Sequence, residues 1–128
     1  MNVVDSSGWL EYFADGPNAT EFARPILAAS TLIVPSVSLF EVFKRVMTQR
    51  GEDAALEAVA LMRQGRVVPL DDALALDGAR LSVEHGLPMA DSIILATALA
   101  HKATLWTQDA DFENVSGVRY LPKPRPST

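Results

Sequence analysis

The chain has 128 residues, a size that fits one domain able to bury a core without disulfides or a structural metal. Apolar residues make up 48% of it, which excludes a disordered chain, and the net charge of −5 argues against attraction of nucleic acid by the whole surface. No apolar run is as long as a membrane span, and the N-terminus does not resemble a signal peptide. Since cysteine is also absent, we expect a globular protein compatible with the cytoplasm.

Short apolar segments alternate with helical patterns along most of the chain. The segments expected to form strands are 2–5, 31–34, 66–70, 103–106 and 117–121. The longer helices are expected at about 38–50, 52–64, 72–86 and 88–101, after two shorter ones near the N-terminus. Strands joined by helices imply right-handed βαβ units, so we predict an α/β fold: an α/β/α sandwich around a central parallel sheet of about five strands.

Local signals predict several helix ends and buried faces. Ser6 is expected to cap the first helix, and Ser38 with Glu41 matches a capping box at the start of a later one. The apolar periodicity places Leu56 toward the core in the segment 52–64, and it makes Val83 available for packing in the segment 72–86. The two segments 38–50 and 52–64 are expected to form a helical hairpin.

The stretch 87–101 is expected to form a buried helix. Pro88 suits a first helical position, and the residues that follow are apolar on almost every side. One carboxylate, Asp91, lies in the first turn, where burial without a partner costs several kcal/mol. Taken alone, Asp91 either complements the helix dipole or binds a cation.

Four acids from distant parts of the chain are expected at one edge of the sheet, where open parallel sheets bind ligands. Asp5 ends the first strand and Asp109 follows the fourth. Asp91 begins the helix before the fourth strand, and Glu41 lies one turn into the helix after the second. Clustered carboxylates need a cation, and oxygen ligands suit Mg²⁺ or Mn²⁺. Asp111, in the same loop as Asp109, is a further candidate ligand or its replacement.

Each acid also has a structural explanation of its own. Glu41 fits the capping box, Asp91 fits the helix dipole, and Asp109 and Asp111 fit an ordinary turn. Asp5 is harder to explain this way, because an acid directly after an apolar strand packs poorly. Four unrelated explanations would have to coincide at one sheet edge, so the joint placement favours a metal site.

The segments that carry these acids resemble a known family. They are Val3–Ser7, Ser38–Val42, Pro88–Ala98 and Leu105–Phe112. In this order and spacing they resemble a PIN-domain ribonuclease of the VapC toxin type, over residues 1–121, with 122–128 as a Pro-rich tail. The resemblance implies a Mg²⁺-dependent endoribonuclease of a VapBC-type toxin–antitoxin system. It also implies a homodimer and a cognate VapB-type antitoxin that covers the active site.

The resemblance assigns the family's acids by position to Asp5, Glu41, Asp91 and Asp109. We expect Asp5, Asp91 and Asp109 to hold one Mg²⁺ that activates water for hydrolysis of an RNA phosphodiester, with Glu41 and Asp111 as further candidate ligands.

Two hydroxyls and three basic side chains are expected to assist. Thr107 matches the family's hydroxyl after the fourth strand, and Ser6 is placed to touch a phosphate or metal-bound water. Lys44, Arg45 and Arg50 are candidates for guiding the RNA backbone, although such side chains also form plain solvated faces.

Two alternatives remain at this stage. The first is a non-catalytic signalling module resembling a response-regulator receiver, which Asp71 after the third strand and Lys123 after the fifth fit superficially. That reading leaves Glu41 and Asp91 without a role. The second is a PIN fold kept as a protein-binding subunit. No base-reading pattern is visible, so transfer, ribosomal and messenger RNA are all open as substrates.

Overall fold

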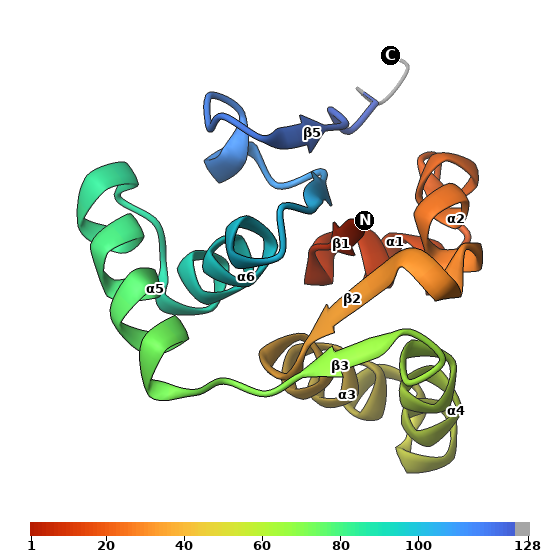
Figure 1. Ribbon diagram of the computed structural model, residues 1–128. Helices are drawn as coiled ribbons and strands as arrows, with labels where there is room; N and C mark the ends of the chain where they lie inside the picture. Colours follow the sequence, from red (N-terminus) through yellow and green to blue (C-terminus); the bar gives the residue numbers. More distant parts are fainter. Residues whose placement is uncertain (125–128) are drawn as a thin grey trace.

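A five-stranded parallel sheet forms the centre of the computed structural model, which describes residues 1–124 (Figure 1). The strands lie in the order β3-β2-β1-β4-β5, and each neighbouring pair is parallel. Their bounds are Asn2–Val4 (β1), Leu32–Pro35 (β2), Arg66–Val68 (β3), Thr104–Thr107 (β4) and Val118–Tyr120 (β5). The predicted α/β/α sandwich is confirmed. Residues 125–128 of the tail expected at 122–128 lie outside the described part.

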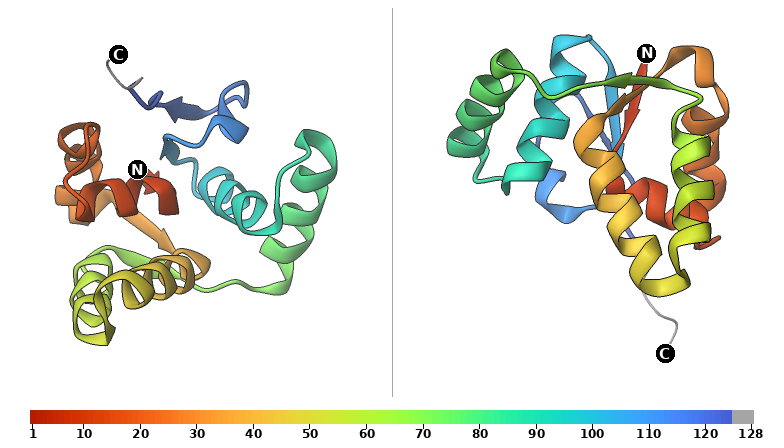
Figure 2. Two further views of the ribbon diagram at one scale, coloured as in Figure 1. Left: turned by 180° about the vertical axis from the view of Figure 1, so that it is seen from behind. Right: turned by 90° about the horizontal axis from the view of Figure 1, so that it is seen from below.

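Six helices flank the sheet in the described residues. They are α1 (Ser6–Phe13), α2 (Ala19–Leu27), α3 (Ser36–Arg50), α4 (Glu52–Met62), α5 (Asp72–His85) and α6 (Met89–Ala100). Two short 3₁₀ turns follow α2 and β4, at Ala29–Thr31 and Ala110–Phe112. Helices α1, α2 and α4 lie on one side of the sheet, and α6 lies on the other with α5 outside it (Figures 1 and 2). None of these helices has the length and apolarity of a membrane span.

Alternation along the strands divides the core between the two faces of the sheet. Val4 and Trp106 point into the cluster formed with α1 to α4, whereas Val3 and Leu105 point into the cluster formed with α6. The indole N–H of Trp106 donates to Asn2 Oδ1 at 2.8 Å, so the polar atom of this large ring has a partner.

Helix α6 is buried on seven consecutive positions, from Ser92 to Ala98, as its apolar composition predicts. One side contacts the sheet and the outer side is covered by α5. Gly78 makes this close packing possible, because a Cβ at that position would lie 3.3 Å from Ile93 Cγ1. Asp91 therefore lies in the first turn of a helix that is tightly enclosed by its neighbours.

Two predicted helix starts are wrong. The cap of α1 is Asp5, whose carboxylate accepts from the Ser7 backbone N–H, and Ser6 is the first helical residue. Helix α3 begins at Ser36, so Ser38 already lies in its first turn and there is no capping box with Glu41. Helix α3 follows β2 directly and only Asp5 separates α1 from β1, so each helix begins earlier than expected.

Smaller differences concern the position of Pro88 and the exposure of one residue on each of α4 and α5. Helix α6 begins at Met89, one residue later than expected, so Pro88 precedes the first helical position and does not occupy it. Leu56 is 52% exposed, because the buried face of α4 is formed instead by Ala55, Ala58 and Met62. Val83 is 88% exposed, since α5 is the outermost helix and packs mainly against α6.

Candidate metal centre

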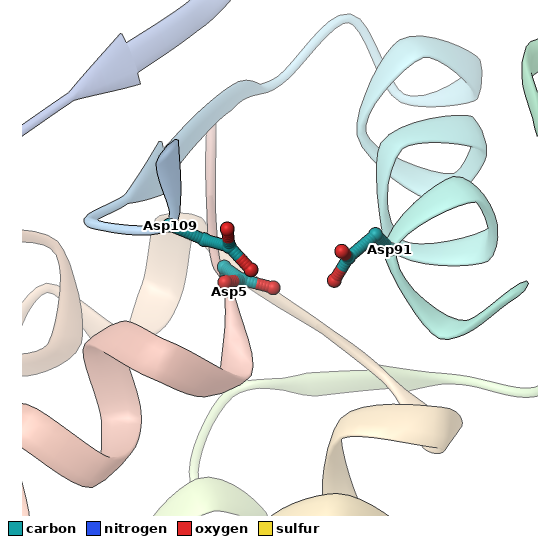
Figure 3. A group of neighbouring side chains, drawn as sticks. All are labelled: Asp5, Asp91 and Asp109. Carbon is teal, nitrogen blue, oxygen red and sulfur yellow. The ribbon is translucent and has the colours of Figure 1, made fainter. Parts of the chain in front are cut away.

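Three aspartates meet at the carboxyl edge of the sheet (Figure 3). Asp5 directly follows β1, Asp109 follows the neighbouring strand β4 by two residues, and Asp91 is the third residue of α6. One carboxylate oxygen from each lies within 4.8 Å of the other two. Figure 3 shows Asp5 and Asp109 close together, with Asp91 facing them from α6. The structure thus brings together three of the four acids that the sequence assigns to this edge.

Asp5 is buried, with 2% of its surface exposed, and its two oxygens have different surroundings. Its Oδ2 accepts hydrogen bonds from the Ser7 hydroxyl at 2.7 Å and the Thr107 hydroxyl at 3.0 Å, and from the Ser7 backbone N–H at 3.3 Å. Its Oδ1 is buried without a hydrogen-bond partner in the described residues. Burial raises the pKa of Asp5, while these hydrogen bonds act in the opposite direction. One oxygen is fixed by the protein, and the other is left for a ligand.

Thr107 connects the two aspartates on the sheet. Its side chain is fully buried at the end of β4, and its hydroxyl oxygen accepts from the Asp109 backbone N–H at 3.0 Å while its proton goes to Asp5. The Asp109 carboxylate in turn accepts from the Asp111 backbone N–H at 2.9 Å. This chain of bonds fixes the loop after β4 relative to β1.

Asp91 has a different environment. Its pKa is raised to about 7, first by partial burial and then by the negative charges of Asp5, Asp109, Glu41 and Asp111, in that order. Without a cation, a proton therefore competes for the Asp91 carboxylate near neutral pH. A divalent ion would offset the mutual repulsion among these carboxylates, which is the second cause of this shift.

Glu41 lies beside the cluster and outside the group of three. Its Oε1 accepts from the Ser6 hydroxyl at 2.7 Å, which links α3 to the start of α1. Asp111 is exposed, and it also lies outside the group of three aspartates. The structure thus groups Asp109, rather than Asp111, with Asp5 and Asp91.

The residues present fit a small divalent cation. Ligand oxygens about 2.0–2.1 Å from Mg²⁺ are roughly 3 to 4 Å apart, so the three aspartates span little more than one coordination sphere. The donor set consists of carboxylate oxygens, which suit a hard ion. The unpartnered Asp5 Oδ1 supplies an independent sign, since a buried carboxylate oxygen without a partner is costly.

The basic residues named from the sequence line two cavities, and Arg45 lines both of them. Arg45 and Arg50 line a cavity that also includes Ser7, the residue after Ser6. Lys44 lines the second cavity together with Glu41, and its ammonium is 5.7 Å from the centre of the Phe40 ring. A role in guiding RNA stays a prediction for all three.

Ser7 is a site residue that the sequence reasoning missed. Its hydroxyl donates to Asp5, lies 3.2 Å from the Thr107 hydroxyl, and accepts from the Gln108 backbone N–H at 3.4 Å. A signal was present: once Asp5 is taken as the cap of α1, Ser7 is the second helical residue, where the capped N–H lies.

The sequence profile of the PIN domain family matches residues 3–118, and the chain belongs to this family. No curated protein sequence matches the chain.

Asp71, on which the receiver-like alternative depended, caps α5 by accepting from the Leu74 backbone N–H at 2.9 Å.

Solved structures of toxin–antitoxin proteins share the fold. A toxin–antitoxin complex from Klebsiella pneumoniae matches with a TM-score of 0.78 at 22% identity, over 93% of this chain and 96% of the other. VapC20 of Mycobacterium tuberculosis, described as a sarcin–ricin loop cleaving toxin, matches with a TM-score of 0.76 at 18% identity, over 91% and 95%. DNA-bound VapBC from Salmonella typhimurium matches with a TM-score of 0.72 at 17% identity, over 95% and 98%.

Proposed function

We propose that the protein is a Mg²⁺-dependent endoribonuclease and the toxin of a VapBC-type toxin–antitoxin module. The observation that carries the proposal is the group of three carboxylate oxygens from Asp5, Asp91 and Asp109, with the buried Asp5 Oδ1 unpartnered. Membership of the PIN family and the fold shared with VapC20 add support.

In this proposal Asp5, Asp91 and Asp109 hold the ion, and Mn²⁺ substitutes for Mg²⁺ because both prefer oxygen ligands. Held by these three carboxylates, the ion would supply an activated water for hydrolysis of the RNA phosphodiester. Glu41 adjoins the cluster and is the ligand of a second ion, and Asp111 is a further candidate ligand.

The other residues position these groups. Ser7 and Thr107 hold one oxygen of Asp5 and leave the other free. Ser6 holds Glu41 through its hydroxyl, so we assign it a positioning role rather than contact with the phosphate. Lys44, Arg45 and Arg50, on the helix that carries Glu41, guide the RNA backbone.

We further propose a homodimer and a cognate VapB-type antitoxin as partners, with RNA hydrolysis in the cytoplasm. The α3–α4 hairpin supports a protein interface, since Phe40, Met47 and Leu56 are 65%, 43% and 52% exposed. The neighbours from Klebsiella pneumoniae and Salmonella typhimurium are toxin–antitoxin assemblies by description.

The test is cleavage of total RNA by the purified chain. We expect cleavage with Mg²⁺ or Mn²⁺, none with EDTA, and a rate at least about 100-fold lower for Asp5→Asn and Asp91→Asn, because each removes a charged ligand. Asp77→Asn is the matched control: this carboxylate is on α5, pairs with Arg80 at 2.7 Å, and is exposed.

Equal cleavage by the aspartate variants and the wild type would contradict the proposed site. The remaining alternative, a PIN fold that only binds protein, predicts Mg²⁺-dependent stability without any cleavage that these variants change.

A further inference from the structure

An open pocket of about 310 Å³ lies between α1, α3 and the end of the described chain. It borders the carboxylate cluster through Ser7, whose hydroxyl is bonded to Asp5. Its size is at the lower end of the range for small-ligand sites, which is about 300–1,000 Å³. We call it the α1–α3 pocket. The site described above does not use its interior.

The α1–α3 pocket is basic in a protein whose net charge is −5. Three cations line it: Arg45, Arg50 and Lys123. Glu11 is the acid in its lining, and Glu11 Oε2 already accepts from the Asn18 backbone N–H at 2.8 Å. A concentration of positive charge beside an acidic metal site suits an anion that must reach that site.

The remaining lining combines apolar and amide side chains. Leu10, Phe13 and Val46 supply apolar surface, and Gln49 and Gln108 supply amides. Apolar and aromatic surface suits the face of a nucleobase, amides suit its edge, and cations suit its phosphate.

The side chain of Gln108 is held in place by a hydrogen bond. It is 7% exposed, and its Oε1 accepts from the Asn18 side-chain amide at 3.1 Å. The same Asn18 amide donates to the Pro122 carbonyl at 3.2 Å, so it also holds the segment that carries Lys123. One side chain, that of Asn18 directly before α2, thus fixes two parts of the pocket wall.

Two further cavities adjoin the α1–α3 pocket through shared lining residues. One, lined by Asp109 and Tyr120, shares Ser7, Gln108 and Lys123 with it. The other, lined by Glu41, shares Arg45. The basic pocket therefore shares wall residues with a cavity that Glu41 lines and with a cavity that Asp109 lines.

We propose that the α1–α3 pocket binds an unstacked nucleotide next to the scissile phosphate of single-stranded RNA, with Arg45 and Lys123 on its phosphates. This inference rests on the proposed ribonuclease function. It adds Lys123 to the RNA-binding residues, and it excludes duplex RNA as the preferred substrate, because a paired, stacked base cannot enter the pocket.

The test is binding of a fluorescent single-stranded RNA oligonucleotide to the full chain in EDTA, over a series of salt concentrations, with the RNA checked on a gel for integrity. Arg45→Gln and Lys123→Gln should each weaken binding roughly fivefold or more at about 0.1 M salt, and each should reduce the slope of log K against log salt by about 0.7. The annealed duplex should bind more weakly than the single strand.

Matched controls come from exposed cations away from the pocket. Arg24→Gln alters a residue of α2 that pairs with Glu21, and Lys102→Gln alters one between α6 and β4, at the edge of the sheet where the strands begin. Both controls should keep the wild-type affinity and salt slope.

Each possible result distinguishes this inference from the function on which it rests. If RNA is cleaved and bound but Arg45→Gln and Lys123→Gln match the controls, the pocket assignment is overturned and the ribonuclease stands. Preference for the duplex overturns the single-strand assignment. A wild-type chain that neither binds nor cleaves RNA overturns both proposals.

Discussion

The two sides of the carboxylate cluster are built in different ways. On the sheet side, Asp5 and Asp109 are tied together by Thr107, and Asp5 is also held by Ser7. On the helix side, no hydrogen bond to the Asp91 carboxylate is present within residues 1–124, and its position depends on the packing of α6. On the sheet side, hydrogen bonds within the protein hold the carboxylates in place. On the helix side, Asp91 experiences charge repulsion that a cation would relieve.

The largest effect should come from breaking the sheet side. Thr107→Val keeps the shape of the side chain but removes the hydroxyl, leaving Asp5 Oδ2 with one donor fewer and the Asp109 N–H without its acceptor. We expect a loss of about 2–3 kcal/mol in the free energy of unfolding and metal affinity about 10–100-fold weaker. Urea denaturation and Mg²⁺ titration measure these quantities.

Thr97→Val is the control for that substitution. Thr97 is equally buried, on α6, but its hydroxyl donates only to the Ile93 carbonyl of its own helix in the described structure. Its loss should cost less than about 1 kcal/mol, since no charged group loses a partner. Similar losses for both variants would mean that the Thr107 hydroxyl has no special role.

The next effect concerns the helix side and its dependence on pH. The Asp91 pKa is raised from 3.8 to about 7, so the metal-free folded state holds this proton more tightly than the unfolded chain. The resulting stability is present at low pH and is lost as pH rises through about 7. We expect unfolding in EDTA to require about 2 kcal/mol less at pH 8 than at pH 5, after allowing for solvent screening of the partly exposed carboxyl.

Asp91→Asn should remove most of this difference, and Mg²⁺ should stabilise the wild type more at pH 8 than at pH 5. The buried Asp5, whose pKa is also raised, contributes a residual dependence in the same direction. An unchanged pH profile in Asp91→Asn would assign the effect to other groups.

The smallest effect should come from Ser6→Ala, at the margin of the cluster. The change removes the 2.7 Å bond to Glu41 but leaves the three aspartates intact. We expect a stability loss below about 1 kcal/mol and a fall of a few-fold in RNA cleavage, measured as initial rates in Mg²⁺. A loss as large as that of Asp91→Asn would place Glu41 among the principal ligands.

The sheet and the acids at its edge could be predicted because both follow from local patterns. β-branched runs mark the strands, and parallel strands present their carboxyl ends on one side, so Asp5 and Asp109 had to be neighbours once β1 and β4 paired. The apolar composition of α6 is also a local pattern, and it predicted the burial of this helix.

Other features depend on contacts that no local pattern encodes. Whether Ser6 or Asp5 caps α1 is decided by where β1 ends, and the choice changes which serine faces the cluster. The exposure of Leu56 and Val83 depends on which neighbour covers each helix. The link from Asn18 to Gln108 joins residues 90 positions apart, and only the folded chain brings them together.

Asp5 caps α1 and also contributes to the carboxylate cluster. These two roles restrict the residues that evolution can place at position 5. Asparagine and serine cap helices about as well as aspartate, whereas alanine does not. A descendant that keeps this fold only for binding other proteins, without the proposed RNA cleavage, should therefore carry asparagine or serine at this position. A chain with alanine there would lose part of its folding stability together with its chemistry.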